Sequence, residues 1–197
     1  MKFGDAAIAM WWDVPAEMQS EWGDWHTHEH MPERLSIPGF LRGSRWVSGS
    51  SYFVLYEVAT LDTLTGGPYL ERLNNPTPWS RKMMPHHRNM VRSLCNVRAR
   101  FGDGVGRALA TLRLDAPLDG LSALPERRGL SAALLLESRP MTGMPQTTEQ
   151  KIRGGDAEAH WIALIGGYDA QAVAVAAKEL APQAVAGLYR LSYLLTA

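Results

Sequence analysis

Short apolar runs alternate with amphipathic segments along the chain, which predicts a mixture of strands and helices. The strand-like runs in the first half of the chain are residues 6–12, 40–47, 52–58 and 93–101. Helical segments are expected at residues 16–30 and 61–73, and a short third helix is expected to begin at Pro78. The order strand, helix, strand, strand, helix, strand is that of a split βαβ unit, the ferredoxin-like repeat.

Proline and capping residues set the expected ends of these elements. Pro15 opens the first helix, and Pro32 is expected to end it, because a proline inside a helix removes a hydrogen bond and clashes with the preceding turn. Residues 48–51, Ser-Gly-Ser-Ser, are typical of a hairpin turn between two strands. Thr77 is the expected N-cap of the short helix that starts at Pro78.

The same order of elements returns in the second half of the chain. Strands are expected at residues 106–114, 131–138, 160–166 and 186–195, with helices at 118–128 and 169–180. Residue identity between the halves is slight, so the duplication is visible in the order of elements. The short linker at Gly102 predicts two ferredoxin-like halves, residues 1–102 and 103–197, of which the second carries a long loop at 140–158. This loop is either a lid or disordered.

Two of the strands are apolar at every position, which a sheet with one solvated face would not be. These are residues 52–56, Tyr-Phe-Val-Leu-Tyr, and 132–136, Ala-Ala-Leu-Leu-Leu. Helices cover one face of a ferredoxin-like half, and the sheet of the other half is the natural cover for the second face. The sequence therefore predicts an α+β chain in which tandem ferredoxin-like βαββαβ repeats form an intramolecular dimeric α+β barrel with antiparallel sheets.

Composition and charge narrow the choice of partners. The chain has 197 residues, with 20 basic and 20 acidic side chains, so its formal net charge is zero. This balance argues against nucleic acid and against an anionic membrane surface as partners, because both require an excess of Lys and Arg. Cys95 is the single cysteine and is expected to be a buried, inert thiol. We expect a cytoplasmic protein, a monomer or homodimer, with a small-molecule ligand.

The densest cluster of polar side chains lies at residues 25–34, Trp-His-Thr-His-Glu-His-Met-Pro-Glu-Arg. His26 and His30 are four residues apart and share a helix face, whereas His28 points elsewhere. Histidine titrates near neutral pH, so His30 is a candidate general acid–base at the mouth of the interior. With Glu33, the two histidines can also form a metal site. A solvated helix end, where a histidine in the last turn is favoured by the helix dipole, explains them better than a metal site does.

Several residues around this cluster resemble the dimeric α+β barrel superfamily, and the pattern is most similar to EthD-like proteins. The matching residues are Trp25, Glu29, His30, Pro32, Glu33, Arg34, residues 37–40 (Ile-Pro-Gly-Phe), Arg45, Trp46, Tyr56 and Glu57. The second half has no histidine at the position that corresponds to His30, so the resemblance implies one pocket. Proteins of this superfamily include monooxygenases, lactone isomerases and haem enzymes, and the fold does not fix the chemistry.

The predicted site combines catalytic and substrate-binding side chains. The catalytic candidates are His30, His26 and Glu29, and the substrate-binding candidates are Arg45, Tyr56, Trp12 and Trp46. Tryptophans of this kind most often build the core. No cofactor and no metal are predicted. The expected function is that of a small-molecule enzyme-like protein with an apolar barrel pocket. Its candidate activities are those of an isomerase or a cofactor-free monooxygenase acting on a carbonyl, enol or aromatic compound.

Two alternatives remain open from the sequence. The chain is a non-catalytic ligand-binding protein in one of them, and a haem or metal protein in the other. His86 and His87 follow Pro85 and are expected to be solvated or interfacial, although either can be drawn as a haem ligand. The glycine-rich residues 102–106 join two strands and open no helix, so a dinucleotide-binding loop is excluded there.

Overall fold

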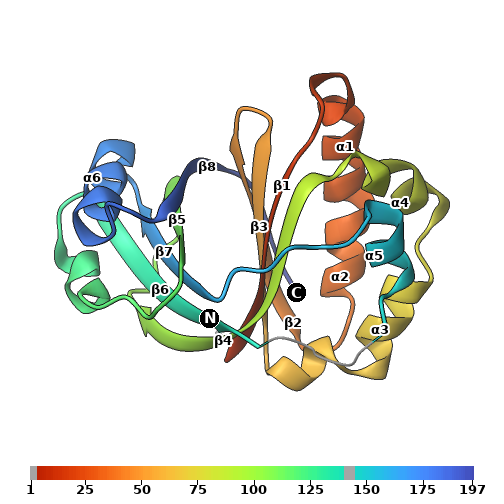
Figure 1. Ribbon diagram of the computed structural model, residues 1–197, viewed down its shortest axis with the longest axis horizontal. Coiled ribbons are helices and arrows are strands. Elements are labelled where there is room, and N and C mark those ends of the chain that lie inside the picture. The colour runs from red at the N-terminus through yellow and green to blue at the C-terminus, as the bar shows by residue number, and fades with distance from the viewer. Residues whose placement is uncertain (1–3, 140–144) are drawn as a thin grey trace.

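The computed structural model describes residues 4–139 and 145–197 and shows eight antiparallel strands in one closed barrel (Figure 1). The strand order is β1-β3-β2-β8-β5-β7-β6-β4. The strands are β1 (Ala6–Asp13), β2 (Phe40–Ser48), β3 (Ser51–Val58), β4 (Arg88–Phe101), β5 (Ala108–Leu114), β6 (Leu130–Ser138), β7 (Trp161–Gly167) and β8 (Val185–Thr196). Each half of the chain supplies four neighbouring strands of the barrel. The predicted fold, tandem ferredoxin-like repeats closed on each other, is confirmed.

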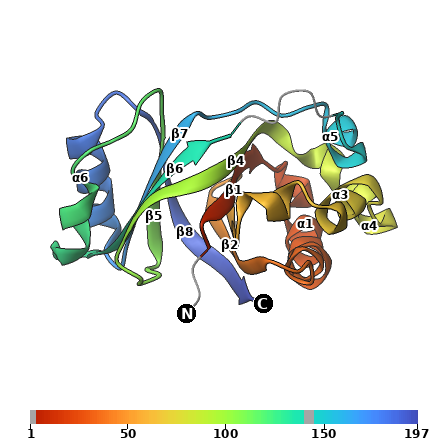
Figure 2. The same cartoon turned by 90° about the horizontal axis from the view of Figure 1, so that it is seen from below.

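The two four-stranded sheets meet along two seams. In one seam β2 pairs with β8, and in the other β4 pairs with β6. Figure 2 shows the strands of both repeats between α6 on one side and α1, α3, α4 and α5 on the other. Because every strand is paired on both sides, the barrel presents no free strand edge.

Helices cover the outer faces of the two sheets unequally. The first repeat carries α1 (Gln19–Trp25), α2 (Met31–Leu35), α3 (Gly67–Asn74) and α4 (Pro78–Met83), and the second carries α5 (Thr148–Arg153) and α6 (Ala170–Leu180). Single 3-10 turns occupy Ala16–Met18, Leu61–Leu64, Met84–His86 and Leu121–Glu126. None of the helices in the described part of the chain is long and apolar enough to cross a membrane.

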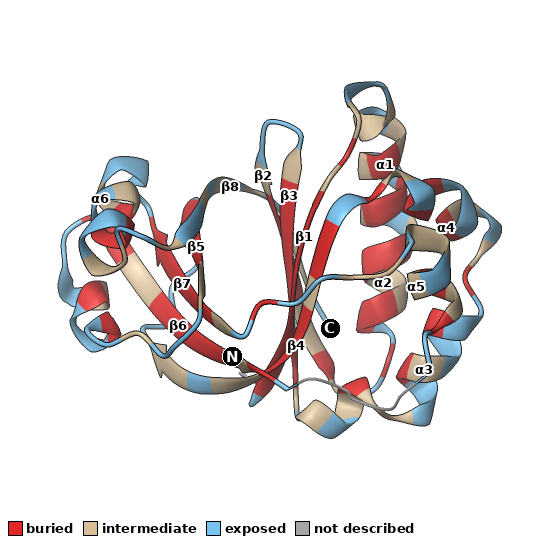
Figure 3. Cartoon of the chain, viewed as in Figure 1, coloured by how far each residue is buried: buried red, intermediate tan, exposed pale blue. Residues whose placement is uncertain are grey.

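Alternation along the strands separates two apolar layers. On β1, Ile8, Met10 and Trp12 face the helices of the first repeat, whereas Ala9 and Trp11 face the barrel interior. This is the period of two expected for a strand that is buried on both faces. Figure 3 shows the result as buried strands in the centre and buried inner faces on the helices at either side.

The first helical region does not end at Pro32, as the sequence predicts, but continues to Leu35. A π-helical turn at His26–His30 joins α1 to α2, and the Met31 N–H donates to the His26 carbonyl five residues before it. Pro32 then lies in the first turn of α2, where a missing N–H costs little. The wider turn accommodates the proline and carries three of the six histidines of the chain.

Two expectations for the second repeat are also corrected. The helix expected at 118–128 is the 3-10 segment Leu121–Glu126, which contains Pro125. The loop expected at 140–158 contains α5, whose N-cap Thr147 forms a capping box with Gln150. Residues 140–144 of this loop lie outside the described part. The boundary at residues 102 and 103 stays a prediction.

Candidate functional site

The segment that carries α5 leaves the second repeat and packs on the first. It contacts α3 and the 3-10 turn Met84–His86, so it lies with the helices of the first repeat in Figure 1. Thr148 N–H donates to Asn74 Oδ1 at 3.1 Å, and Ala157 pairs with Val91 beside β4. We call residues 145–158 the strap. The strap closes one side of a cavity between the helices and the outer face of the first sheet.

Three parts of the structure enclose this cavity: strands β1, β3 and β4, the helices of the first repeat, and the strap. Only about 30 Å³ of it is open to the centre of a water molecule. A site of this size holds roughly two waters, at ~10–15 Å³ each. The lining residues are Ile8, Met10, Trp12, His26, His30, Arg34, Tyr56, Tyr69, Leu73, Met84, His87, Met90, Arg92, Glu149 and Arg153.

Three histidines of the lining are buried: His26, His30 and His87. Burial lowers the pKa of each well below its usual range, and the neighbouring arginines add to the effect, Arg45 at His26, Arg34 at His30 and Arg153 at His87. All three side chains are therefore neutral near pH 7. Their Nδ1 atoms are buried and have no hydrogen-bond partner among the described residues.

The hydrogen bond to His87 fixes which of its nitrogens carries the proton. Trp22 Nε1 donates to His87 Nε2 at 2.8 Å. A neutral imidazole that accepts at Nε2 must carry its hydrogen on Nδ1. His87 Nδ1 is therefore a buried N–H donor without an acceptor. Buried polar groups are normally satisfied, so this atom is a plausible contact for a ligand oxygen.

Aromatic rings hold the histidines in place. His26 stacks on Trp22 with ring centroids 4.8 Å apart, and His87 stacks on Trp12 at 4.7 Å. The His26 and His30 rings lie 5.5 Å apart. These contacts fix three imidazoles that come from two separate segments of the chain. A rigid set of this kind is what proton transfer to a bound substrate requires.

Tyr56 presents its hydroxyl to the same cavity. Its ring packs over Gly43 of the neighbouring strand, where a Cβ atom would lie 2.9 Å from Tyr56 Cε1 and 3.0 Å from Met31 Sδ. The Tyr56 hydroxyl has no hydrogen-bond partner among the described residues, and burial raises its pKa well above its usual range. Tyr56 is therefore a neutral donor next to the histidines.

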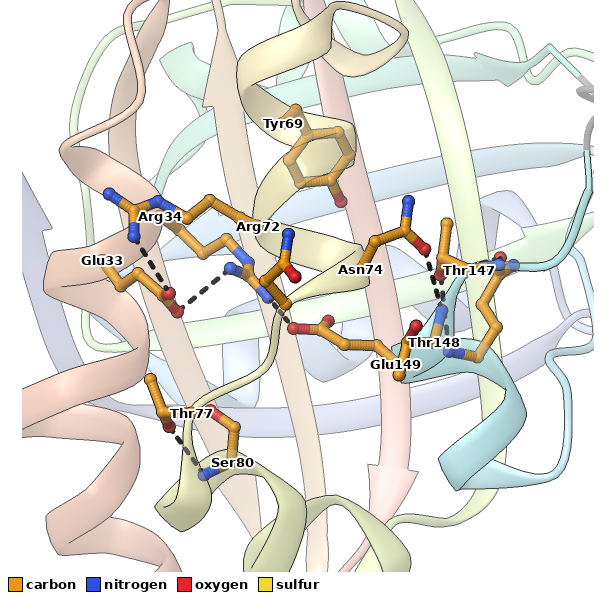
Figure 4. A network of polar contacts seen from close by, with 12 residues as sticks. Glu33, Arg34, Tyr69, Arg72, Asn74, Thr77, Ser80, Thr147, Thr148 and Glu149 are labelled. Atoms are coloured by element: carbon orange, nitrogen blue, oxygen red, sulfur yellow. Dashed lines mark hydrogen bonds and ion pairs between the residues drawn. The ribbon is translucent and has the colours of Figure 1, made fainter.

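A buried ion pair ties the strap to the helical layer. Arg34 of α2 donates to Glu149 of α5 and also to Glu33, the latter at 3.1 Å. Figure 4 shows Arg34 between these two carboxylates, with Arg72 reaching Glu33 from the outside. Burial disfavours the charged form of Arg34, but the Glu149 carboxylate outweighs this effect and the pKa of Arg34 is raised.

The structure brings together four of the seven side chains predicted for the site: His26, His30, Tyr56 and Trp12. It places them on the helical side of the first sheet, so the expected position of His30 at the mouth of the barrel interior is wrong. The physical reason is the packing of the first helical region on the outer face of the sheet. Side chains of the same strands that face the barrel interior point away from the first helical region.

The other three predicted residues lie elsewhere. Glu29 accepts from Trp25 and Thr77, on the side of the helix that meets α4. Arg45 donates to the Gly23 carbonyl, and its guanidinium lies over the Trp22 ring at 5.7 Å, behind the cavity wall. Trp46 lies inside the barrel, where Nε1 donates to Ser44.

Several residues of the lining are not predicted from the sequence, His87 above all. His87 is not solvated as expected but buried. It caps the 3-10 turn Met84–His86, which contains Pro85, and its extended backbone leads into β4. Tyr69 and Arg92 are also absent from the residues predicted for the site, and Arg34 matches the family pattern without a predicted role in the site. Glu149 belongs to the long loop, where the Thr147–Gln150 capping-box pattern is the signal that identifies a helix.

The positions of the histidine and acidic side chains test whether this region can hold a metal ion. Within residues 4–139 and 145–197, no group of three or more histidine, cysteine or acidic side chains is placed to hold a metal ion. Glu33, the carboxylate that would join His26 and His30, is directed at Arg34 and Arg72 instead. The Nε2 atom of His87 is also occupied by Trp22.

Comparison with known proteins identifies the fold. No protein-family model matches the sequence, and no curated protein matches it either. An anthrone oxidase-like protein has a similar structure, with a TM-score of 0.65, 11% identity, and coverage of 98% of this chain and 93% of its own. A candidate monooxygenase from Fusobacterium nucleatum subsp. nucleatum has a TM-score of 0.53, 5% identity, and coverage of 99% and 96%.

At these identities the likeness shows the fold alone. The class defined by the fold is the dimeric α+β barrel, here with both ferredoxin-like repeats in one chain. The resemblance to EthD-like proteins in particular stays a prediction from the sequence. Chemistry has to be argued from the cavity of the first repeat.

Proposed function

We propose that the chain is a cofactor-free enzyme that removes a proton from an acidic carbon of an aromatic ketone or enol. The resulting enolate then reacts with O₂. The observation that carries this proposal is the set of three buried, neutral histidines with unpartnered Nδ1 atoms in one cavity. Neutral imidazole is a base, and it is strongest as a catalyst when the proton it gains is matched by a new negative charge nearby.

The residues take different roles in this mechanism. His30 is the base that accepts the carbon-bound proton. His87 Nδ1–H and the Tyr56 hydroxyl donate hydrogen bonds to the enolate oxygen as its charge develops, which is the arrangement of an oxyanion hole. In a dry cavity the imidazolium and the enolate stabilise each other as a pair. Trp12 supplies an apolar wall for the ring system.

The oxygenation step balances without a cofactor. The enolate carbon transfers electrons to O₂ and forms a C–O bond, giving a peroxide. The second hydrogen of that carbon then leaves as a proton that ends on the distal peroxide oxygen as the O–O bond breaks, which yields the quinone and hydroxide. The hydroxide takes the first proton back from the His30 imidazolium and becomes water. Anthrone and O₂ thus give anthraquinone and water. The name of the anthrone oxidase-like neighbour makes anthrone a suitable first probe.

The test measures oxygen uptake and quinone absorbance with anthrone for the wild type and two matched variants. His30→Gln should lower kcat by about 10²–10⁴-fold, the usual effect of losing a general base. His28→Gln removes an exposed histidine from the same helical region and should leave kcat unchanged. Thermal unfolding confirms that both variants are folded. Full activity in the His30→Gln variant would exclude the mechanism.

An isomerase differs from an oxygenase only after proton removal. Exchange of the acidic C–H with solvent deuterium, followed by NMR under nitrogen, tests the first step by itself. Exchange that depends on His30 without oxygen uptake assigns an isomerase. Binding of anthrone without exchange assigns a ligand-binding protein and contradicts the proposal.

A further inference from the structure

The cavity has a charged end formed by arginines, next to the strap. Arg34, Arg92 and Arg153 line it, with a single carboxylate, Glu149, among the lining residues. A guanidinium inside a protein is normally matched by a carboxylate, since its charge is costly to remove from water. An arginine that has no carboxylate partner within the protein is therefore a candidate to bind a negatively charged ligand.

Two of the three arginines are matched within the protein. Arg34 pairs with Glu149 and Glu33. Arg153 forms a two-point contact with Asp156, at 3.1 and 2.8 Å, and approaches Glu149 at 3.7 Å. The nearby carboxylates are therefore already engaged.

Arg92 is the exception. It is partly buried, and it forms no ion pair with any residue in 4–139 or 145–197. The remaining residues of the chain, 1–3 and 140–144, have no acidic side chains. Within the described part of the chain, the Arg92 guanidinium forms one side-chain hydrogen bond, from Nη2 to the Tyr69 hydroxyl at 3.0 Å. Burial opposes the charge of Arg92, but Tyr69 and the more distant carboxylates keep its pKa raised.

Tyr69 complements Arg92 as a second donor. Its oxygen accepts from Arg92, so its own hydrogen is available, and Tyr69 lines the same cavity. An arginine fork beside a hydroxyl donor matches the two oxygens of a carboxylate. The three neutral histidines add no competing charge at this end.

We propose that Arg92 and Tyr69 bind the carboxylate of a small aromatic or unsaturated acid, which is the substrate class of this cavity. That such an acid is the substrate rests on the proposed function, whereas binding of its carboxylate by Arg92 and Tyr69 does not. The carboxylate anchors the substrate at the arginine end, and the acidic carbon faces His30. The natural substrate is an anion, and a neutral ketone such as anthrone binds without this anchor.

The experiment compares the binding of benzoate with that of benzamide, its neutral counterpart of similar shape, by titration calorimetry or ligand-observed NMR. The wild type should bind benzoate at least about tenfold more tightly, equivalent to ~1.4 kcal/mol. Arg92→Met keeps the apolar stem and removes the charge, so it should abolish the preference. Arg72→Met removes a half-exposed arginine that pairs with Glu33 and should retain it.

Further variants keep the outcome interpretable. If Arg92→Met does not fold, Tyr69→Phe removes only a hydroxyl and should weaken benzoate several-fold without affecting benzamide. Equal affinity for the two compounds, no benzoate binding at millimolar concentration, or an unchanged preference in Arg92→Met would overturn the inference. His30→Gln should lose turnover but keep the preference for benzoate, so failure of the reaction and failure of the anchor give different results.

Discussion

At the scale of single residues, the cavity depends on histidines that are buried in their neutral form. Protonation of any of the three places a charge beside arginines in a buried site, and both effects lower the pKa values of the histidines. In the unfolded chain the same side chains bind a proton near pH 6.5. Below that pH the unfolded chain therefore holds more protons than the folded one, and the folded state loses stability.

This gives a prediction for urea unfolding between pH 7.5 and pH 5. Stability should fall as the pH drops below about 6.5, by up to ~1.4 kcal/mol per pH unit for each histidine that stays neutral in the folded state. His26→Gln should reduce the slope of stability against pH by the contribution of one proton, up to ~1.4 kcal/mol per pH unit. His28→Gln, at an exposed position, should not change it. A stability that is flat over this range would show that the three histidines are not held neutral.

Histidine burial was only partly predictable from the sequence. The spacing of His26 and His30 places both on one helix face, and the structure confirms that they lie together. His87 comes from the start of a distant strand, and nothing near it in the sequence reveals that Trp22 donates to it. Contacts between residues 65 positions apart are decided by the packing of the helices on the sheet.

At the scale of elements, the strap depends on the Arg34–Glu149 ion pair and on the capping box of α5. The cavity that it closes has room for about two waters, so an aromatic substrate requires the strap to move. Glu149→Gln leaves the Arg34 guanidinium buried with Glu33 as its remaining carboxylate. Removing one partner of a buried pair typically costs ~3–5 kcal/mol, and the second carboxylate places this variant near the lower limit.

The predicted consequence is local rather than uniform. Glu149→Gln should raise the rate of hydrogen exchange or proteolytic cleavage within residues 145–158, with a smaller effect on the barrel strands. Arg127 pairs with Glu179 on the surface of the second repeat, so Glu179→Gln is the matched control and should change neither quantity. Unchanged exchange in the strap of Glu149→Gln would mean that the ion pair does not hold it.

The sequence predicted most elements, and its errors have identifiable causes. The strands were placed well because their apolar runs are bounded by turn residues, as at Gly49 between β2 and β3. The end of the first helix was misplaced because the π-helical turn compensates for Pro32, which local propensity does not reveal. The loop that contains the strap is expected from the sequence, but helix α5 within it is not, because six residues are too few to show a helical period.

At the scale of the whole molecule, two tandem repeats with the same order of elements have come to differ. The first repeat has a full helical layer and the histidines, and the second has one long helix and a 3-10 segment on its sheet. The second repeat instead contributes the strap to the first. The cavity that holds the three buried histidines therefore contains residues from both halves of the chain.

A second cavity lies inside the barrel and is the main alternative location for the functional site. It measures about 60 Å³ and is lined by apolar side chains such as Trp46, Leu55 and Leu134, with Glu57 paired to Arg42 and Arg100 at one end. It contains none of the histidines. A substrate bound there would be out of reach of every base proposed above.

The most direct test is therefore a crystal structure of the protein with benzoate, at a concentration that saturates the calorimetric titration. The proposed site predicts electron density between Arg92, Tyr69 and His30, beneath the strap. Density next to Trp46 in the barrel interior would contradict it and would transfer the functional site to the other face of the sheet.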